Sequence, residues 1–383
     1  MEAINYRTRI EKLAKALREA GLEAYVGTRL ASLHYLVGAF IPWRGAVVIT
    51  AKGEAELIYW AMDSERVRSE APHVPVIEWG AGKPPFIESV ARELREKGVA
   101  TGRIGLDLSI AGTGQEAPGL LYAHEFIDLK KLLPSARLEN GTGPIDALML
   151  VKTPEEVERL RLAAKAADAG FQAGLAAVKP GVTENHVAGA IEQATRDEGS
   201  TWAWSVTGGT EVGSGERTGY FRGVTQQATE KKIGNNEFLI LDLHPMVELY
   251  LADLGLPVFL GTPSDEQKRM IDCWEETVAG LLSSLKPGRA VADICSQAVK
   301  VFAKYGFQNF GLPMFGHGLG TCARLRPFMN TKSEDILVAG MVLALGTHLY
   351  VPGAGGLRLE YPTLITESSA VALCLTPPKV HYI

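Results

Sequence analysis

The stretch that decides the fold occupies residues 237–261 and reads EFLILDLHPMVELYLADLGLPVFLG. Its apolar runs predict two β-strands separated near Pro245, because Leu, Ile, Val and Phe fit strands well. Successive side chains of a strand point to opposite faces, so Asp242 and His244 share one face of the first strand. Asp253 falls in the second predicted strand. A buried carboxylate needs a counter-charge, a metal ion or hydrogen-bond donors, which makes both aspartates candidate site residues.

The composition is that of an ordinary folded protein. The chain has 383 residues, 46% hydrophobic and 22% charged, which is enough for two domains. A net charge of −5 gives no reason to expect nucleic acid or an anionic membrane as a partner. No apolar run approaches the ~20 residues of a membrane span. Four widely spaced cysteines and no evident secretory signal predict a cytoplasmic protein.

A domain boundary is expected near residue 148. Helical and strand patterns alternate through the first part of the chain, as in a small α/β domain. The run Thr153-Pro154-Glu155-Glu156 then combines a capping Thr, a Pro at the first helical position and a Glu three residues after the cap. It predicts the start of a long helix. We therefore expect domains at 1–147 and 148–383.

The second domain contains an internal sequence repeat. The tripeptide Lys-Pro-Gly occurs at residues 179–181 and again at residues 286–288, each time between two predicted helices. Matched flanking helices indicate a duplicated half-domain. A site at the pseudo-twofold junction is the usual consequence of such a layout.

Two further motifs carry residues suited to metal binding. The run FGHGLG at residues 315–320 places His317 among glycines, and GGLRLE at residues 355–360 puts Arg358 and Glu360 on one face of a strand. Asp242, Asp253, His317 and Glu360 together offer the carboxylate and imidazole ligands that a hard or borderline divalent ion prefers.

These motifs, with LHYLVG at residues 33–38 and KTPEE at residues 152–156, resemble the pita-bread metallopeptidase superfamily of creatinase, prolidase, aminopeptidase P and methionine aminopeptidase. The resemblance covers nearly the whole chain. It implies an α/β (α+β) protein: a small α/β N-terminal domain followed by a duplicated pita-bread catalytic domain, usually in a homodimer. It also implies metal ligands at Asp242, Asp253, His317 and Glu360.

The sequence departs from the family pattern at three positions. Gly346 stands where the family has a fifth ligand, a glutamate, and Arg324 and Arg222 stand where the family has histidines that donate protons or hydrogen bonds. An arginine does not exchange protons near neutrality, but it binds carboxylates bidentately. These changes make ordinary peptidase chemistry doubtful and favour an anionic substrate group.

Two histidines could replace what is lost. His244 lies two residues beyond Asp242, and His348 lies two residues beyond Gly346. A neutral imidazole can act as a ligand or as a general base, whereas the alternative is a hydrogen-bonded structural histidine.

A further pair of candidate residues lies in the N-terminal domain. Trp43 and Arg44 stand where creatinase-like members place an aromatic residue and an arginine from the partner subunit against the substrate. The alternative is a packing tryptophan with an arginine whose stem lies along apolar surface. Arg324, with Arg222 and Arg44, is expected to bind the substrate's negative group.

The leading functional hypothesis is a creatinase- or prolidase-like hydrolase. It would cleave a C–N bond (amide, imido or amidino) in a small carboxylate-bearing substrate, using one or two ions of Mn, Fe, Co or Zn. The alternatives are a metal-dependent lyase on the same scaffold, a catalytically silent binding protein, and a metal-free enzyme that keeps these acids as relics, since creatinase works without a metal.

Overall fold

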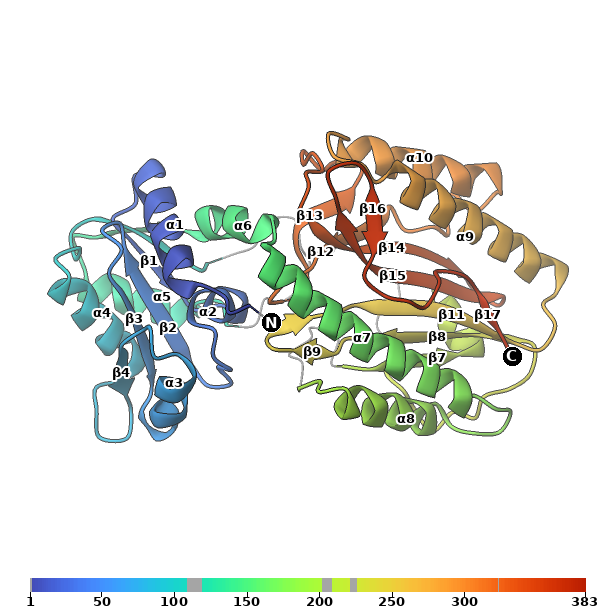
Figure 1. Ribbon diagram of the computed structural model, residues 1–383, viewed down its shortest axis with the longest axis horizontal. Helices are drawn as coiled ribbons and strands as arrows, with labels where there is room; N and C mark the ends of the chain where they lie inside the picture. The colour runs from blue at the N-terminus through green and yellow to red at the C-terminus, as the bar shows by residue number, and fades with distance from the viewer. Residues whose placement is uncertain (1, 109–118, 202–208, 221–225, 323) are drawn as a thin grey trace. The chain divides into compact units, whose positions relative to one another are not determined.

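The computed structural model describes residues 2–108, 119–201, 209–220, 226–322 and 324–383. The chain forms two compact units, Glu2–Met149 and Leu150–Ile383, each with its own sheet (Figure 1). None of the helices in these described ranges combines the length and the apolar character that crossing a membrane requires.

The N-terminal unit is built on a six-stranded mixed sheet. Its strand order is β4 (Val76–Trp79), β3 (Ala55–Trp60), β2 (Gly45–Thr50), β1 (Ala24–Gly27), β5 (Arg103–Leu106) and β6 (Arg137–Asn140). The pairs β1–β2 and β2–β3 are antiparallel and the other three are parallel. The helices of this unit are α1 (Tyr6–Glu19), α2 (Leu30–Val37), α3 (Ser64–Glu70), α4 (Phe86–Glu96), α5 (Ala123–Leu132) and α6 (Thr142–Leu150).

The C-terminal unit is built on a nine-stranded sheet. Its main order is β13 (Leu325–Asn330), β12 (Met314–Gly318), β14 (Val342–Val351), β15 (Gly355–Ile365), β11 (Leu254–Leu260), β8 (Glu237–Leu243) and β7 (Glu211–Ser214). Two short strands, β16 (Ala370–Ala372) and β17 (His381–Tyr382), add to β15 and β11. Every pair is antiparallel except β11–β17. Every residue of β14 and β11 is buried, as expected for central strands covered on both faces.

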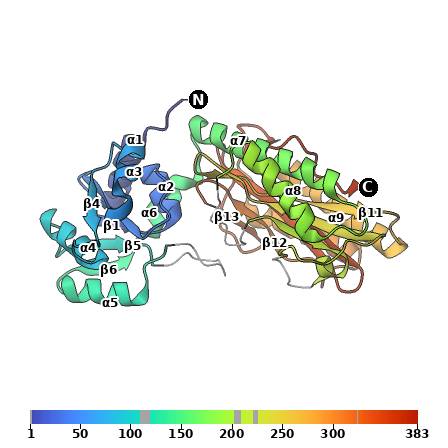
Figure 2. The same cartoon turned by 90° about the horizontal axis from the view of Figure 1, so that it is seen from below.

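The expected duplication is present in this unit. Helices α7 (Pro154–Ala177) and α8 (Glu184–Asp197) precede β7, β8 and β11, whereas α9 (Asp265–Ser284) and α10 (Val291–Lys304) precede β12, β14 and β15. Helix α7 packs on β8 and β11, and α9 packs on β14 and β15. Figure 2 shows α7 and α8 side by side. The predicted fold class, an α/β domain followed by a duplicated pita-bread domain, is confirmed.

Local sequence signals explain where α7 begins and how closely it packs. Thr153 and Glu156 form the predicted capping box, in which the Thr153 backbone N–H donates to Glu156 Oε2 at 3.0 Å. Within the helix, a methyl group at Gly170 would lie 2.8 Å from Leu243 Cδ2, and one at Gly174 would lie 2.9 Å from Ile191 Cδ1. The two glycines therefore allow α7 to approach both β8 and α8.

The prediction of a single second strand after Pro245 is wrong. Residues 246–251 form a hairpin of their own, β9 (Met246–Val247) and β10 (Tyr250–Leu251), and β11 begins only at Leu254. The turn residues Glu248 and Leu249 have φ angles of 49° and 68°. A two-residue turn of this kind usually contains Asn-Gly or Asp-Gly. Glu248-Leu249 lacks these residues, so the sequence contains no signal for the turn. Asp253 consequently precedes β11 instead of lying within a strand.

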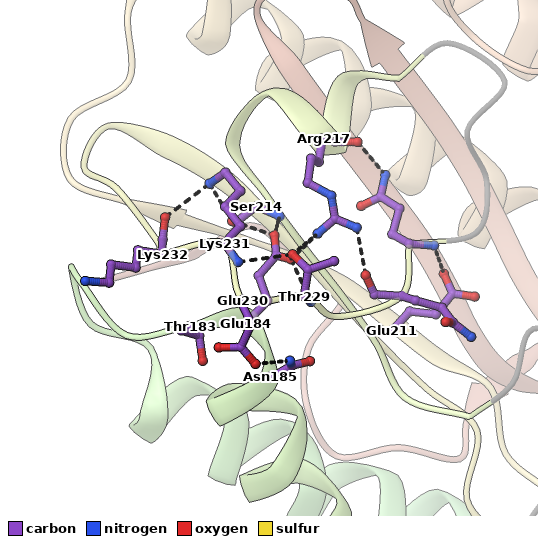
Figure 3. Close-up of polar contacts among 12 residues, drawn as sticks. Thr183, Glu184, Asn185, Glu211, Ser214, Arg217, Thr229, Glu230, Lys231 and Lys232 are labelled. Carbon is purple, nitrogen blue, oxygen red and sulfur yellow. Dashed lines mark hydrogen bonds and ion pairs between the residues drawn. The ribbon is translucent and has the colours of Figure 1, made fainter.

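A buried acid anchors the beginning of α8. Glu184 is fully buried, and its Oε1 accepts hydrogen bonds from the Ser214 backbone N–H and hydroxyl, both at 2.8 Å. Its Oε2 accepts from the Thr229 hydroxyl at 2.7 Å and pairs with Arg217 (Figure 3). One carboxylate thus ties α8 to β7, to the turn at Arg217 and to the segment around Thr229.

We expect Glu184→Ala to lower the free energy of unfolding by about 3–5 kcal/mol, because Arg217 and the surrounding donors would lose their buried anionic partner. Urea unfolding of the full chain measures the change. Glu192→Ala, at an exposed position of the same helix, is the matched control and should change stability by no more than about 0.5 kcal/mol. Equal effects of the two substitutions would contradict the anchoring role.

Candidate metal centre

The predicted ligands lie on or next to four strands of the C-terminal sheet. Asp242 lies on β8, Asp253 just before β11, His317 on β12 and Glu360 on β15. Gly255 on β11 pairs with Asp242 on one side and with Glu360 on the other. A methyl group at Gly255 would lie 2.9 Å from Asp242 Oδ1 and 3.3 Å from Glu360 Cβ. The absence of a side chain at this position leaves room for both acids.

The four predicted ligands meet in a buried cluster. Their exposed fractions are only 2–4%, and His317 Nε2 lies 3.3 Å from Asp253 Oδ2. Two groups of three have donor atoms close enough together to share an ion. One group is Asp253, His317 and Glu360, and the other is Asp242, His244 and Asp253. Asp253 belongs to both.

The donor atoms of this cluster fit a divalent cation. Each predicted ligand has one buried atom without a hydrogen-bond partner in the described parts of the chain: Asp242 Oδ1, Asp253 Oδ1, His317 Nε2 and Glu360 Oε2. Buried polar atoms are rarely left unsatisfied without a reason. Carboxylate oxygens and imidazole nitrogens are the usual ligands of Mn, Fe, Co and Zn.

Arg358 on β15 compensates part of the negative charge. One of its nitrogens, Nη1, donates to Asp242 Oδ2 and to Glu211 Oε2, each at 2.7 Å. Glu211 on β7 is an acid that the sequence analysis missed, because the family pattern does not point to it. Burial raises the pKa of Glu211, against the opposing effect of Arg358. Only Oδ1 of Asp242 is then left for a cation.

His244 faces the two aspartates. Its Nδ1 lies 2.7 Å from the Gly209 carbonyl oxygen, and its Nε2 lies 3.2 Å from Asp253 Oδ1 and 3.7 Å from Asp242 Oδ1. Burial opposes the charged imidazole, but Asp253 and then Asp242 outweigh it and raise the pKa of His244 to about 10. Burial would likewise raise the pKa of Asp253, yet His244 and His317 hold it well below its usual range. The cluster thus attracts positive charge.

His348 on β14 contacts the opposite side of the cluster. Its Nε2 lies 3.1 Å from Glu360 Oε1. Burial, followed by the charges of Arg358 and Arg324, lowers the pKa of His348 to about 3. Burial and the neighbouring Asp253 raise the pKa of Glu360 to about 8. Without a cation, these shifts place the shared proton on Glu360 near neutral pH, and ligation of a metal would require that proton to leave.

Gly346 occupies the position of the missing glutamate. It pairs with Glu360 across β14 and β15, and a methyl group at Gly346 would lie 3.2 Å from Glu360 Oε2. A side chain at this position would therefore enter the cluster. The glycine supplies no ligand there.

Arg324 lies beside His317, one of the predicted ligands. Its φ angle is 62°, and its backbone N–H lies 3.2 Å from His317 Nδ1. After burial and Arg358, it is the next contributor to the lowered pKa of His348. Its charge therefore reaches the predicted site, although its role toward a substrate remains a prediction.

For three predicted substrate-binding residues, the described structure gives no placement relative to this cluster. Arg222 lies outside the described residues. Trp43 and Arg44 belong to the N-terminal unit, where Arg44 pairs with Glu125 and donates to the Gly119 carbonyl at 3.0 Å. Trp43 is 53% exposed and its ring lies 4.9 Å from that of Trp60. Their contribution to a substrate site remains a prediction.

A duplicated pita-bread sheet that gathers buried acids and imidazoles from its central strands defines a protein of the metallopeptidase class. Comparison with family models agrees over both units. Residues 9–148 match the creatinase/prolidase N-terminal domain, and residues 158–367 match metallopeptidase family M24. The chain belongs to metallopeptidase family M24.

Individual relatives cover almost the whole chain. A Xaa-Pro dipeptidase from Pyrococcus furiosus is 24% identical over 370 residues, covering 97% of this chain and 98% of the relative. The structure of a Xaa-Pro dipeptidase from Bacillus anthracis superimposes with a TM-score of 0.85 at 25% identity, covering 99% of this chain and all of that one. The prolidase from Pyrococcus horikoshii OT3 has the same fold, with a TM-score of 0.84 at 22% identity and coverage of 97% and 99%.

These comparisons support a prolidase-like hydrolase of the M24 family. They favour peptidase chemistry, against the expectation that the departures at Gly346, Arg324 and Arg222 make it doubtful. The expectation gave too much weight to single positions, since the buried acid and imidazole cluster forms without them.

We expect Arg358→Met to lower the free energy of unfolding by about 3–5 kcal/mol, because it leaves the buried Glu211 and Asp242 without their shared cation. Adding Glu211→Gln should recover part of this loss by removing one of the two charges. Urea unfolding measures both effects. Arg326→Met is the control, since the Arg326–Asp335 pair is half-exposed and should contribute no more than about 1 kcal/mol. If the double variant loses as much stability as the sum of the Arg358→Met and Glu211→Gln losses, the two residues are not coupled.

Proposed function

We propose that this protein is a divalent-metal-dependent hydrolase that cleaves the peptide or imido C–N bond of a small, dipeptide-like substrate with a free carboxylate. The observation that carries the proposal is the set of four unpartnered buried donor atoms on Asp242, Asp253, His317 and Glu360, in a chain of the M24 family. The printed names of its relatives, Xaa-Pro dipeptidases, suggest the substrate class to test first.

The buried acids and His317 would bind the metal. Asp242, Asp253, His317 and Glu360 would hold one or two ions of Mn, Fe, Co or Zn. When bound, such an ion supplies a Lewis acid and lowers the pKa of water. Burial excludes bulk water from these four side chains, which strengthens every electrostatic interaction inside the cluster.

Proton transfer would fall to an imidazole next to the cluster. His348 and His244 are the two candidates, since each presents Nε2 to a carboxylate of the ligand set. His348 contacts the Oε1 atom of Glu360 and is held neutral, so it can accept a hydrogen bond from the protonated Glu360 carboxyl, but its lowered pKa makes it the weaker base of the two histidines.

Arg324 would bind the substrate carboxylate. A guanidinium forms two parallel charge-assisted hydrogen bonds to a carboxylate, and this orientation favours a substrate with a free C-terminus. Arg222 and Arg44 are further candidates for the same task. A homodimer in the cytoplasm remains the expected form of the protein.

The purified protein should contain Mn, Fe, Co or Zn and hydrolyse Xaa-Pro dipeptides, and removal of the metal by a chelator should abolish turnover. Asp253→Ala should lower kcat/KM by at least about 10³-fold, or about 4 kcal/mol, because Asp253 belongs to both ligand groups. Elemental analysis and a dipeptidase assay measure these outcomes. Asp272→Ala, at an exposed position of α9, is the control. Unaltered metal content and activity in Asp253→Ala would refute the site.

Arg324→Ala should raise KM for a dipeptide by about 10- to 100-fold, because a charge-assisted pair contributes about 1.5–3 kcal/mol. It should affect the corresponding dipeptide amide far less, since the amide lacks the charge that Arg324 recognises. Arg326→Ala is the control from the same segment, with its guanidinium already paired to Asp335. Equal effects of Arg324→Ala on acid and amide would count against carboxylate binding.

A further inference from the structure

The ligand set that the family resemblance carries does not include His244, yet the structure brings His244 into the cluster. It is 7% exposed and its Nε2 is one of three donor atoms, with oxygens of Asp242 and Asp253, that lie close enough to share an ion. This group is separate from the one formed by Asp253, His317 and Glu360, apart from the shared Asp253.

The orientation of the His244 ring suits a metal ligand. The Gly209 carbonyl, 2.7 Å from Nδ1, can only accept a hydrogen bond, so Nδ1 carries a proton. In the neutral imidazole the lone pair is then on Nε2, which faces the two aspartates. A hydrogen bond from the other ring nitrogen to a backbone carbonyl is the usual support of a metal-binding histidine.

The distances also suit coordination. Donor atoms bound at about 2.0–2.2 Å to one ion lie about 3.0–3.5 Å apart at tetrahedral or octahedral angles. His244 Nε2 lies within this range of Asp253 Oδ1, at 3.2 Å, and slightly beyond it from Asp242 Oδ1, at 3.7 Å. Both oxygens lack a hydrogen-bond partner in the described chain, whereas Asp242 Oδ2 is taken by Arg358. Three protein donors with an open position are typical of a catalytic metal site.

Asp253 belongs both to the group with Asp242 and His244 and to the group with His317 and Glu360. Its Oδ1 faces His244 Nε2 and its Oδ2 faces His317 Nε2, at 3.2 and 3.3 Å. Each half of the cluster therefore pairs one imidazole with one oxygen of the same carboxylate. Gly346, on the Glu360 side, offers no carboxylate, so the cluster has lost an oxygen donor and gained a nitrogen donor.

We propose that His244 is a metal ligand in this protein, binding an ion together with Asp242 and Asp253 beside a second ion held by Asp253, His317 and Glu360. The proposal rests on the proposed function as a metal-dependent hydrolase. Two imidazoles in place of one shift the preference of the cluster toward Zn and Co, which imidazole suits better than it suits Mn or Mg.

Metal titration of the chelator-treated full chain with ZnCl₂ or CoCl₂ tests the proposal. Calorimetry should give two ions per chain for the wild type and one for His244→Ala. His348→Ala is the matched control: it is also a buried histidine on the cluster, but it contacts Glu360 Oε1 and leaves the unpartnered Oε2 in place, so it should keep two ions. Two ions with unchanged affinity in His244→Ala would overturn the proposal.

A second variant gives a positive signal that does not depend on activity. His244→Cys puts a thiolate at the same position, and thiolates bind both Co and Zn. With Co(II) it should show a thiolate-to-cobalt charge-transfer band that the wild type, with its four native cysteines, does not show. A folded His244→Cys protein that binds Co(II) without this band would overturn the ligand assignment. Failure of the wild type to bind any metal would instead overturn the proposed function itself.

Discussion

The C-terminal unit is organised around the mutual repulsion of three buried carboxylates. Asp242, Asp253 and Glu360 come from adjacent segments of one sheet and are almost completely shielded from water. Like charges this close cannot all remain ionised without compensation. Neighbouring groups reduce this repulsion. Arg358 neutralises one oxygen of Asp242, and the imidazoles of His244 and His317 face Asp253. The raised pKa of Glu360 favours its protonated, neutral form. A divalent cation would satisfy the remaining donor atoms together.

The surrounding fold makes this concentration of charge possible. Glycine at position 255 leaves space for two acids on neighbouring strands, and Arg358 links β15 to β8 and β7 through Asp242 and Glu211. Further along β7, Ser214 binds Glu184, the acid that anchors α8. Polar interactions therefore extend from the helical layer to the cluster. A sheet held by such contacts can keep ligands in place before an ion binds, which reduces the cost of organising the site.

Relative to the family pattern, the chain keeps the fold but differs at residues in and around the cluster. The glutamate expected at Gly346 is absent, while histidines occur two residues beyond Asp242 and two residues beyond Gly346. Because strand residues two apart share a face, both imidazoles reach the same cluster as Asp242 and Gly346, the residues two before them. The membership of family M24 and the likeness to a Xaa-Pro dipeptidase structure show that the fold is kept despite these differences.

The sequence by itself determined that the chain has two α/β domains, the second of them duplicated. The capping box at Thr153, the repeated Lys-Pro-Gly turns and the period-two strands are local signals, and the structure contains the elements they predict except for the single strand expected after Pro245. The four candidate ligands could be named from the sequence because each stands in a distinctive motif, and the structure brings them together in one buried cluster. Only the tertiary structure showed that Glu211 shares Arg358 with Asp242, that Glu248 and Leu249 form a turn before Asp253, and that the two oxygens of Asp253 face different imidazoles. These relations depend on pairing between strands far apart in the chain, which no local pattern encodes.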